Sequence, residues 1–185
     1  MDIVLVKAPT AAPVNLADLK KHVIASDFTD DDDILQMYLD AAVNHMDGYS
    51  GVLGRALMTQ EWAVQACEWR ACFTMPMKPV KGVALKYFDE ANVERIVPDT
   101  SYRLSGETLW LDSSFTRPSL YARGDAISVV FTLGEDDPAD VPAAIKAAIL
   151  LMAAGLYANR EQIGGQAYEN PAFDLLISPY RRMHP

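Results

Sequence analysis

Residues 141–161 read VPAAIKAAILLMAAGLYANRE, and this pattern predicts one long helix. Pro142 suits a first helical turn because a proline has no N–H that would lack a partner there, and Asp140 is a candidate cap just upstream. One apolar set recurs at helical spacing: Ile145, Ile149, Met152 and Leu156. A second set covers much of the other side: Leu150, Leu151, Ala154 and Tyr157. A helix that is apolar nearly all round must be covered on both flanks.

The length of this helix, about twenty residues, would also be enough to span a bilayer. Lys146 within it and the polar end at residues 159–161 favour a place inside a protein instead. We expect one flank to pack in its own domain. The other flank, which carries the second apolar set, is covered either by more of the chain or by a neighbouring copy. That second set is our candidate subunit interface.

The composition is that of an ordinary globular protein, with 185 residues of which 50% are apolar and 22% charged. The formal charge of −9 argues against a grip on nucleic acid that works by neutralising phosphates. Cys67 and Cys72 lie five apart in a strand-like region, so we expect two buried thiols in a reducing compartment and no disulfide. The first residues lack the basic region of a signal peptide, so we expect synthesis and retention in the cytoplasm before any assembly.

Two helices are predicted near the N-terminus. Asn15 is a good N-cap for the first, which should end near Ser26. Thr29 is the expected cap of the second, with four aspartates at residues 30–33 in its first turn, where the helix dipole favours them. These acids could also be read as a metal site, but the run lacks the glycine and distal glutamate of an EF-hand loop. The second helix should end at Gly48, with this recurring face: Leu35, Tyr38, Ala42, His45 and Tyr49.

From Gln60 the apolar period changes from about 3.6 to 2, which indicates strands. Strand faces and hairpin signals recur up to residue 134, and the clearest alternation is this set: Ile127, Val129, Phe131 and Leu133. We therefore expect an α+β fold, a small helical bundle of two N-terminal helices and the long C-terminal helix, with an inserted, mostly antiparallel β-rich region. The expected single domain covers residues 1–163, with helices in 14–51, the β-rich insertion at 60–134 and the central helix at 141–161.

Gly164 and Gly165 break the chain after the central helix, and residues 164–185 form a tail. This tail carries a few apolar residues that cover either the domain's own surface or a partner. The sequence offers no G-x-S-x-G elbow, P-loop, dinucleotide-type glycine run or H-E-x-x-H, and its three histidines are far apart. Residues 51–55 hold two glycines but follow a helix, so a turn is the plain interpretation. We predict no enzyme activity, no metal and no cofactor.

The order of these pieces resembles the head–tail connector, or adaptor, proteins of tailed bacteriophages and related gene-transfer particles. The segments that carry the resemblance cover nearly the whole chain: residues 16–51, GRALMTQEW at 54–62, DTSYRL at 99–104, residues 127–161 with their DVP start and NRE end, and LLISPYRR at 175–182. The long β-rich middle looks like the larger branch of that family.

The resemblance implies a ring, typically of twelve copies, beneath the portal vertex in the neck of a virion or phage-like particle. Such a ring extends the DNA channel without sequence-specific binding and offers a surface to a tail-side head-closure protein, with no membrane involved. The C-terminal segment of the family commonly docks on the portal, which here implies these candidates: Phe173, Leu175, Leu176, Tyr180, Arg181 and Arg182. The alternatives are a head-completion or tail-terminator protein, or a DNA-packaging accessory enzyme.

Overall fold

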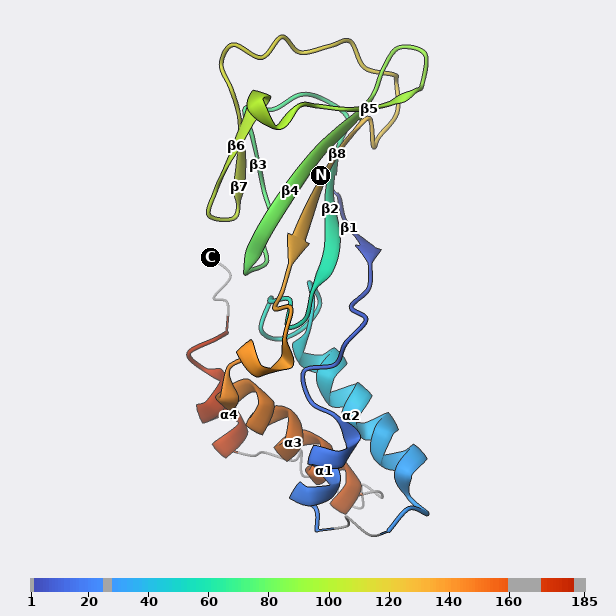
Figure 1. The fold of residues 1–185 in the computed structure, drawn as a ribbon, viewed down its shortest axis with the longest axis vertical. Coiled ribbons are helices and arrows are strands. Elements are labelled where there is room, and N and C mark those ends of the chain that lie inside the picture. Colours follow the sequence, from blue (N-terminus) through green and yellow to red (C-terminus); the bar gives the residue numbers. More distant parts are fainter. Residues whose placement is uncertain (1, 25–27, 160–170, 182–185) are drawn as a thin grey trace. The chain divides into compact units, whose positions relative to one another are not determined.

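The computed structural model describes residues 2–24, 28–159 and 171–181 of the chain (Figure 1). The fold is mixed α+β with antiparallel sheets, so the predicted class is confirmed. Contacts divide the chain into two compact units, each built from two segments. The β unit consists of residues 1–10 and 59–134, and the helical unit of residues 11–58 and 135–185.

A five-stranded antiparallel sheet forms most of the β unit (Figure 1). Its strands, in spatial order, are β1 (Asp2–Lys7), β2 (Gln60–Ala66), β8 (Ile127–Leu133), β4 (Val80–Phe88) and β5 (Glu94–Ile96). The N-terminal residues form an edge strand of this sheet, in which Ile3 pairs with Val64.

β8 lies at the centre of this sheet between β2 and β4, and its alternation is the one that the sequence predicts. Val129 pairs with Val64 on one side and with Leu85 on the other, and all three side chains are fully buried. Because residues directly opposite one another share a face of the sheet, these residues form the covered face of the β unit.

A second sheet has the order β3 (Cys72–Thr74), β7 (Thr108–Leu111) and β6 (Tyr102–Ser105). The hairpin between β6 and β7 turns at Gly106, whose φ of 60° suits glycine. A short 3₁₀ turn, η1 (Asp99–Ser101), leads into β6. β3 is absent from the sequence-based expectation, because a three-residue strand between turns has too few residues to display a period.

The expectation of two buried cysteines is wrong. Cys67 is exposed and Cys72 half-buried, and both are free thiols. The reason is that β2 ends at Ala66, so Cys67 lies in a bend where strand alternation no longer decides which side chains are covered.

The helical unit contains α1 (Leu16–His22), α2 (Asp32–Met46), α3 (Ala143–Ala158) and α4 (Pro171–Ile177), with a 3₁₀ turn, η2 (Pro138–Asp140), ahead of α3. The predicted N-cap of α1 is confirmed, because Asn15 Oδ1 accepts a hydrogen bond from the Asp18 N–H at 2.9 Å. Side chains from all four helices meet in one core, whose fully buried members include Leu19, Leu35, Ile149 and Ile177. Among the described residues, none of the helices combines the length and the apolar character that a membrane span requires.

The predicted start and face of α2 need correction. The N-cap residue is Asp31, not Thr29, and its side chain makes no capping hydrogen bond. Of the predicted face, Leu35 and Ala42 are buried, whereas His45 and Tyr49 are exposed. Leu39 and Met46 complete the buried face. α2 ends at Met46, so Tyr49 no longer follows the helical period.

The start of α3 also differs from the prediction. Pro142 is the N-cap residue, one position before the helix, and Asp140 lies in η2. Asp137 caps that turn, because its carboxylate accepts a hydrogen bond from the Ala139 N–H at 2.8 Å. Lys146 holds η2 against α3 by donating to the Pro138 carbonyl at 3.0 Å.

Candidate functional site

The candidate interface on α3 lies at the border between core and solvent. Its members Leu150, Leu151, Ala154 and Tyr157 are all half-buried, whereas Ile145, Ala148, Ile149 and Ala153 on the other flank are completely buried. Leu150 and Tyr157 pack partly against the helical core. The chain therefore covers one flank of α3 fully and the other in part.

Tyr157 already has a partner within the chain. Its hydroxyl donates a hydrogen bond to Asp31 Oδ2 at 2.7 Å, which ties the end of α3 to the start of α2. Leu150 and Lys146 of α3 line a groove of about 490 Å³ together with residues of α1 and its approach: Pro13, Val14, Asp18, Lys21 and His22. The part of this flank that reaches outward is thus centred on Leu150, Leu151 and Ala154.

The aspartates at the start of α2 serve packing between helices. Asp31 accepts from Tyr157, and Asp32 Oδ1 lies 2.8 Å from the Nζ of Lys20, whose side chain is 10% exposed. The aspartates therefore do more than interact favourably with the helix dipole, because Asp32 contacts α1 and Asp31 contacts α3. Within the described residues, no three acidic, histidine or cysteine side chains converge in a way that could hold a metal ion.

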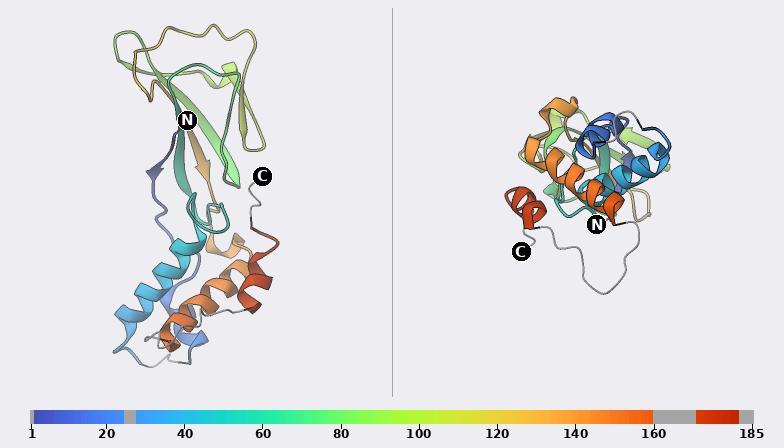
Figure 2. Two further views of the ribbon diagram at one scale, coloured as in Figure 1. Left: turned by 180° about the vertical axis from the view of Figure 1, so that it is seen from behind. Right: turned by 90° about the horizontal axis from the view of Figure 1, so that it is seen from below.

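Part of the predicted docking tail packs on its own helical unit. The views in Figure 2 show α4 beside α3, and these two helices are in contact. Ile177 is fully buried, and the following docking candidates pack against the core: Phe173, Leu176 and Tyr180. Phe173 also approaches the ring of His45, with 6.3 Å between ring centroids.

Other docking candidates remain on the surface. Leu175 is 76% exposed, and Arg181 is exposed with its guanidinium 2.7 Å from the Asp174 carboxylate. Arg182 lies outside the described residues. The tail thus divides into an anchoring side that faces the core and an outward side centred on Leu175 and Arg181.

The loop between α2 and β2 is a buried connector that the sequence does not reveal. Asp47 accepts a hydrogen bond from the Leu57 N–H at 2.7 Å, and Arg55 lies 3.3 Å from Glu135 at the other chain segment of the helical unit. A Cβ on Gly51 would collide with the backbone of Met46 and Asp47. Gly51 therefore permits a close backbone approach in this turn, and Gly54 has a φ of 54° that suits glycine.

Trp110 is a further surface residue whose role sequence reasoning missed. It pairs with Arg103 across β6 and β7, and its side chain is 42% exposed. Trp110 and Arg103 line a hollow of about 470 Å³. Exposed tryptophan and arginine side chains are frequent at the energetic centres of protein interfaces. The alternation of residues 109–111 predicts that Trp110 points to the other face of the strand from Leu109 and Leu111. It does not predict which of the two faces is exposed.

Comparisons with known proteins identify the fold. No family model matches the chain, and no curated protein matches its sequence. Among solved structures, a chain in the neck of an empty gene transfer agent particle computed with C6 symmetry is similar, with a TM-score of 0.77 and 24% identity. A chain in the virion of a native gene transfer agent particle gives the same values. A chain in a native neck computed with C12 symmetry gives 0.76 and 23%.

Each of these alignments covers 100% of this chain and 97% of the other. The predicted resemblance to proteins of gene-transfer particles is therefore confirmed at the level of the fold, over the full length and in both units.

Proposed function

We propose that this chain is a structural neck component of a phage-like or gene transfer particle, and that it acts there as a head–tail adaptor. The observation that carries the proposal is the full-length match to chains of particle necks, at a TM-score of 0.77. Because the match covers the whole chain, it includes the β-rich insertion and α4 as well as α1, α2 and α3. The proposed role is structural, without catalytic turnover.

A ring of identical copies is part of the proposal. Two of the similar structures are necks computed with C6 and C12 symmetry. In a ring the contact is heterologous, so one surface of each copy meets a different surface of the next. The outward flank of α3, with Leu150, Leu151 and Ala154, is the proposed lateral contact on the helical unit. The net charge of −9 supports a channel wall along which DNA slides without being gripped.

The outward side of the tail is the proposed portal contact. Leu175 offers an apolar side chain and Arg181 a cation, and the Asp174 carboxylate restrains the Arg181 guanidinium. The anchoring side keeps this segment attached to its own core. Removing the whole tail would therefore also expose the core around Ile177, so point substitutions give a cleaner test.

The test is association of the purified chain with its cognate portal, read by co-sedimentation and by cryo-electron microscopy. We expect Leu175→Asp to abolish the association with little change in folding stability, because this side chain is 76% exposed. Met37→Asp on α2 is the matched control, since Met37 is 57% exposed, and it should bind as the unchanged chain does. Binding of the unchanged chain to a tail tube but not to the portal would instead identify a tail-terminator or head-completion protein.

A further inference from the structure

The outer edge of β1 is open and apolar. β1 ends the five-stranded sheet, and its sequence DIVLVK places Val4, Leu5 and Val6 at 41%, 44% and 53% exposure. Free edges are usually protected by proline, by inward-pointing charge or by a covering element, because an open edge recruits another strand. Residues 2–5 of β1 form a regular ladder with β2 and carry no proline or covering element, whereas the register shifts between Leu5 and Lys7, so the open edge is the segment Asp2–Leu5.

The opposite edge of the same sheet is a short strand that also carries an exposed apolar side chain. β5 ends the sheet on that side, Ile96 in it is 70% exposed, and Val93 just before it is 45% exposed. Apart from Trp110 and Tyr121, all exposed large apolar side chains in the described part of the β unit lie on or beside these two edges.

The two edges are compatible in direction and in face. Each neighbouring pair in the sheet is antiparallel, so β1 and β5 run in the same direction after four such steps. The register forms one continuous row across the sheet: Asp2, Gln65, Ser128, Lys86 and Ile96. Ile96 therefore lies on the same face as Asp2, and Val4, two residues along β1, shares that face.

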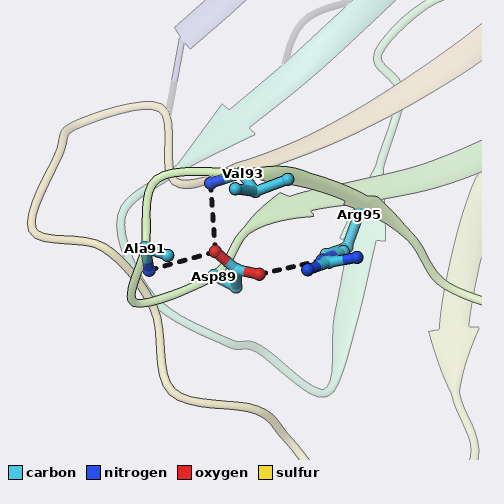
Figure 3. A network of polar contacts seen from close by, with 4 residues as sticks. All are labelled: Asp89, Ala91, Val93 and Arg95. Atoms are coloured by element: carbon cyan, nitrogen blue, oxygen red, sulfur yellow. Dashed lines mark hydrogen bonds and ion pairs between the residues drawn. The ribbon is translucent and has the colours of Figure 1, made fainter.

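The β5 edge is held in place by its own turn. Figure 3 shows that Asp89 accepts hydrogen bonds from the N–H groups of Ala91 and Val93, each at 3.0 Å, while its other oxygen accepts from Arg95 Nε at 2.8 Å. Glu94 pairs with Lys86 at 3.2 Å. The charged side chains of β5 are thus engaged within the hairpin, and a prearranged edge costs less to bind than a mobile one.

We infer that β1 of one copy adds to the β5 edge of the next copy, in parallel, so that the five-stranded sheets join laterally around the ring. This inference rests on the proposed function for its choice of partner, a second copy in a ring. Unlike edges at the two ends of one sheet form the heterologous contact that a ring requires, and both apolar edges become covered. The contact is additional to the flank of α3.

Cross-linking of rings assembled on the portal tests the pairing. In a chain with Cys67→Ser and Cys72→Ser, which removes the native thiols, Val4→Cys and Ile96→Cys are combined and treated with a short bis-maleimide. We expect a ladder of cross-linked oligomers in denaturing gels. Each single-cysteine variant should stay a monomer, and so should Val4→Cys combined with cysteine at the exposed loop residue Thr116.

A charge exchange tests whether the two residues are energetically coupled. Ile96→Glu should raise the protein concentration needed for half-assembly about tenfold or more, because it places a charge in the apolar contact. Adding Val4→Lys should restore a large part of that loss, whereas Val6→Asp should not.

The outcomes separate the two claims. Failure to form any ring, seen by electron microscopy, would refute the proposed function and this inference with it. Rings that give no ladder, or show no rescue by Val4→Lys, would overturn the edge pairing alone. A cross-linked dimer from Val4→Cys by itself would also overturn it, because that product requires β1 to pair with β1 across a two-fold axis.

Discussion

At the scale of single residues, the Lys20–Asp32 pair is the clearest case of a charge used for packing. Lys20 is 8% exposed overall, yet its ammonium reaches the 34% exposed carboxylate of Asp32 at 2.8 Å. Lys20→Ala should lower the free energy of unfolding by about 1–2 kcal/mol, less than for a fully buried pair because water still reaches Asp32. Urea unfolding of Lys21→Ala, whose 4.0 Å pair with Asp18 is exposed, is the control and should differ by less than about 0.5 kcal/mol. Equal losses in both variants would contradict the assignment.

Asp89 gives a residue-scale prediction for pH. The hydrogen bond from Arg95, followed by that from the Val93 N–H, holds the pKa of this carboxyl below its ordinary value of 3.8. Because the pKa is lower in the folded protein, the ionised carboxyl stabilises the fold. This stabilisation is complete at pH values above the ordinary pKa, and it is lost as the pH falls through the folded-state pKa. Amide signals of Ala91 and Val93 in NMR spectra should therefore be constant from neutral pH to about 5 and shift only below about 4. In Asp89→Asn this acid transition should vanish, and its persistence would assign it to another group.

At the scale of elements, Trp69 organises the long loop that joins β7 to β8. Its indole N–H donates to the Pro118 carbonyl at 2.8 Å, and its ring packs on Tyr87 and Phe115 with centroids 5.4 Å and 5.5 Å away. Trp69→Ala should cost about 2–3 kcal/mol and speed chymotryptic cleavage after Phe115, whose ring it would no longer cover. Trp110→Ala, at a 42% exposed position, is the matched control and should leave the cleavage rate unchanged. Similar cleavage rates for both variants would show that the loop does not depend on Trp69.

Elements whose apolar pattern repeats over many residues were predictable from the sequence. Features that depend on tertiary contacts were not. The alternation of β8 and the cap at Asn15 are local signals that the structure keeps. Thr29 failed as a cap because Asp31 and Asp32 are drawn to partners on α3 and α1, which no local pattern reveals. The apolar side chains of the tail were visible in the sequence, but the split that buries Ile177 and leaves Leu175 outside depends on the face of α3 that receives α4.

At the scale of the whole molecule, the outward flank of α3 carries the prediction for assembly. Leu151→Glu should prevent ring formation, because it adds a charge where the next copy is proposed to pack. The unfolding free energy should fall by only about 1 kcal/mol, since Leu151 is half-exposed in the single copy. Ala41→Glu on α2, at an exposed position, is the control and should form rings normally. Normal rings from Leu151→Glu would remove this flank from the interface.

Each compact unit is assembled from two segments that are distant in the chain, and this arrangement governs when folding can occur on the ribosome. Translation must reach Leu133 before the middle strand of the large sheet exists, and Ile177 before the helical core is complete. At about 5–20 residues per second, β2 and β4 emerge several seconds before β8 can separate them. The nascent chain therefore stays unfolded until most of it has been made, and both units then form nearly together.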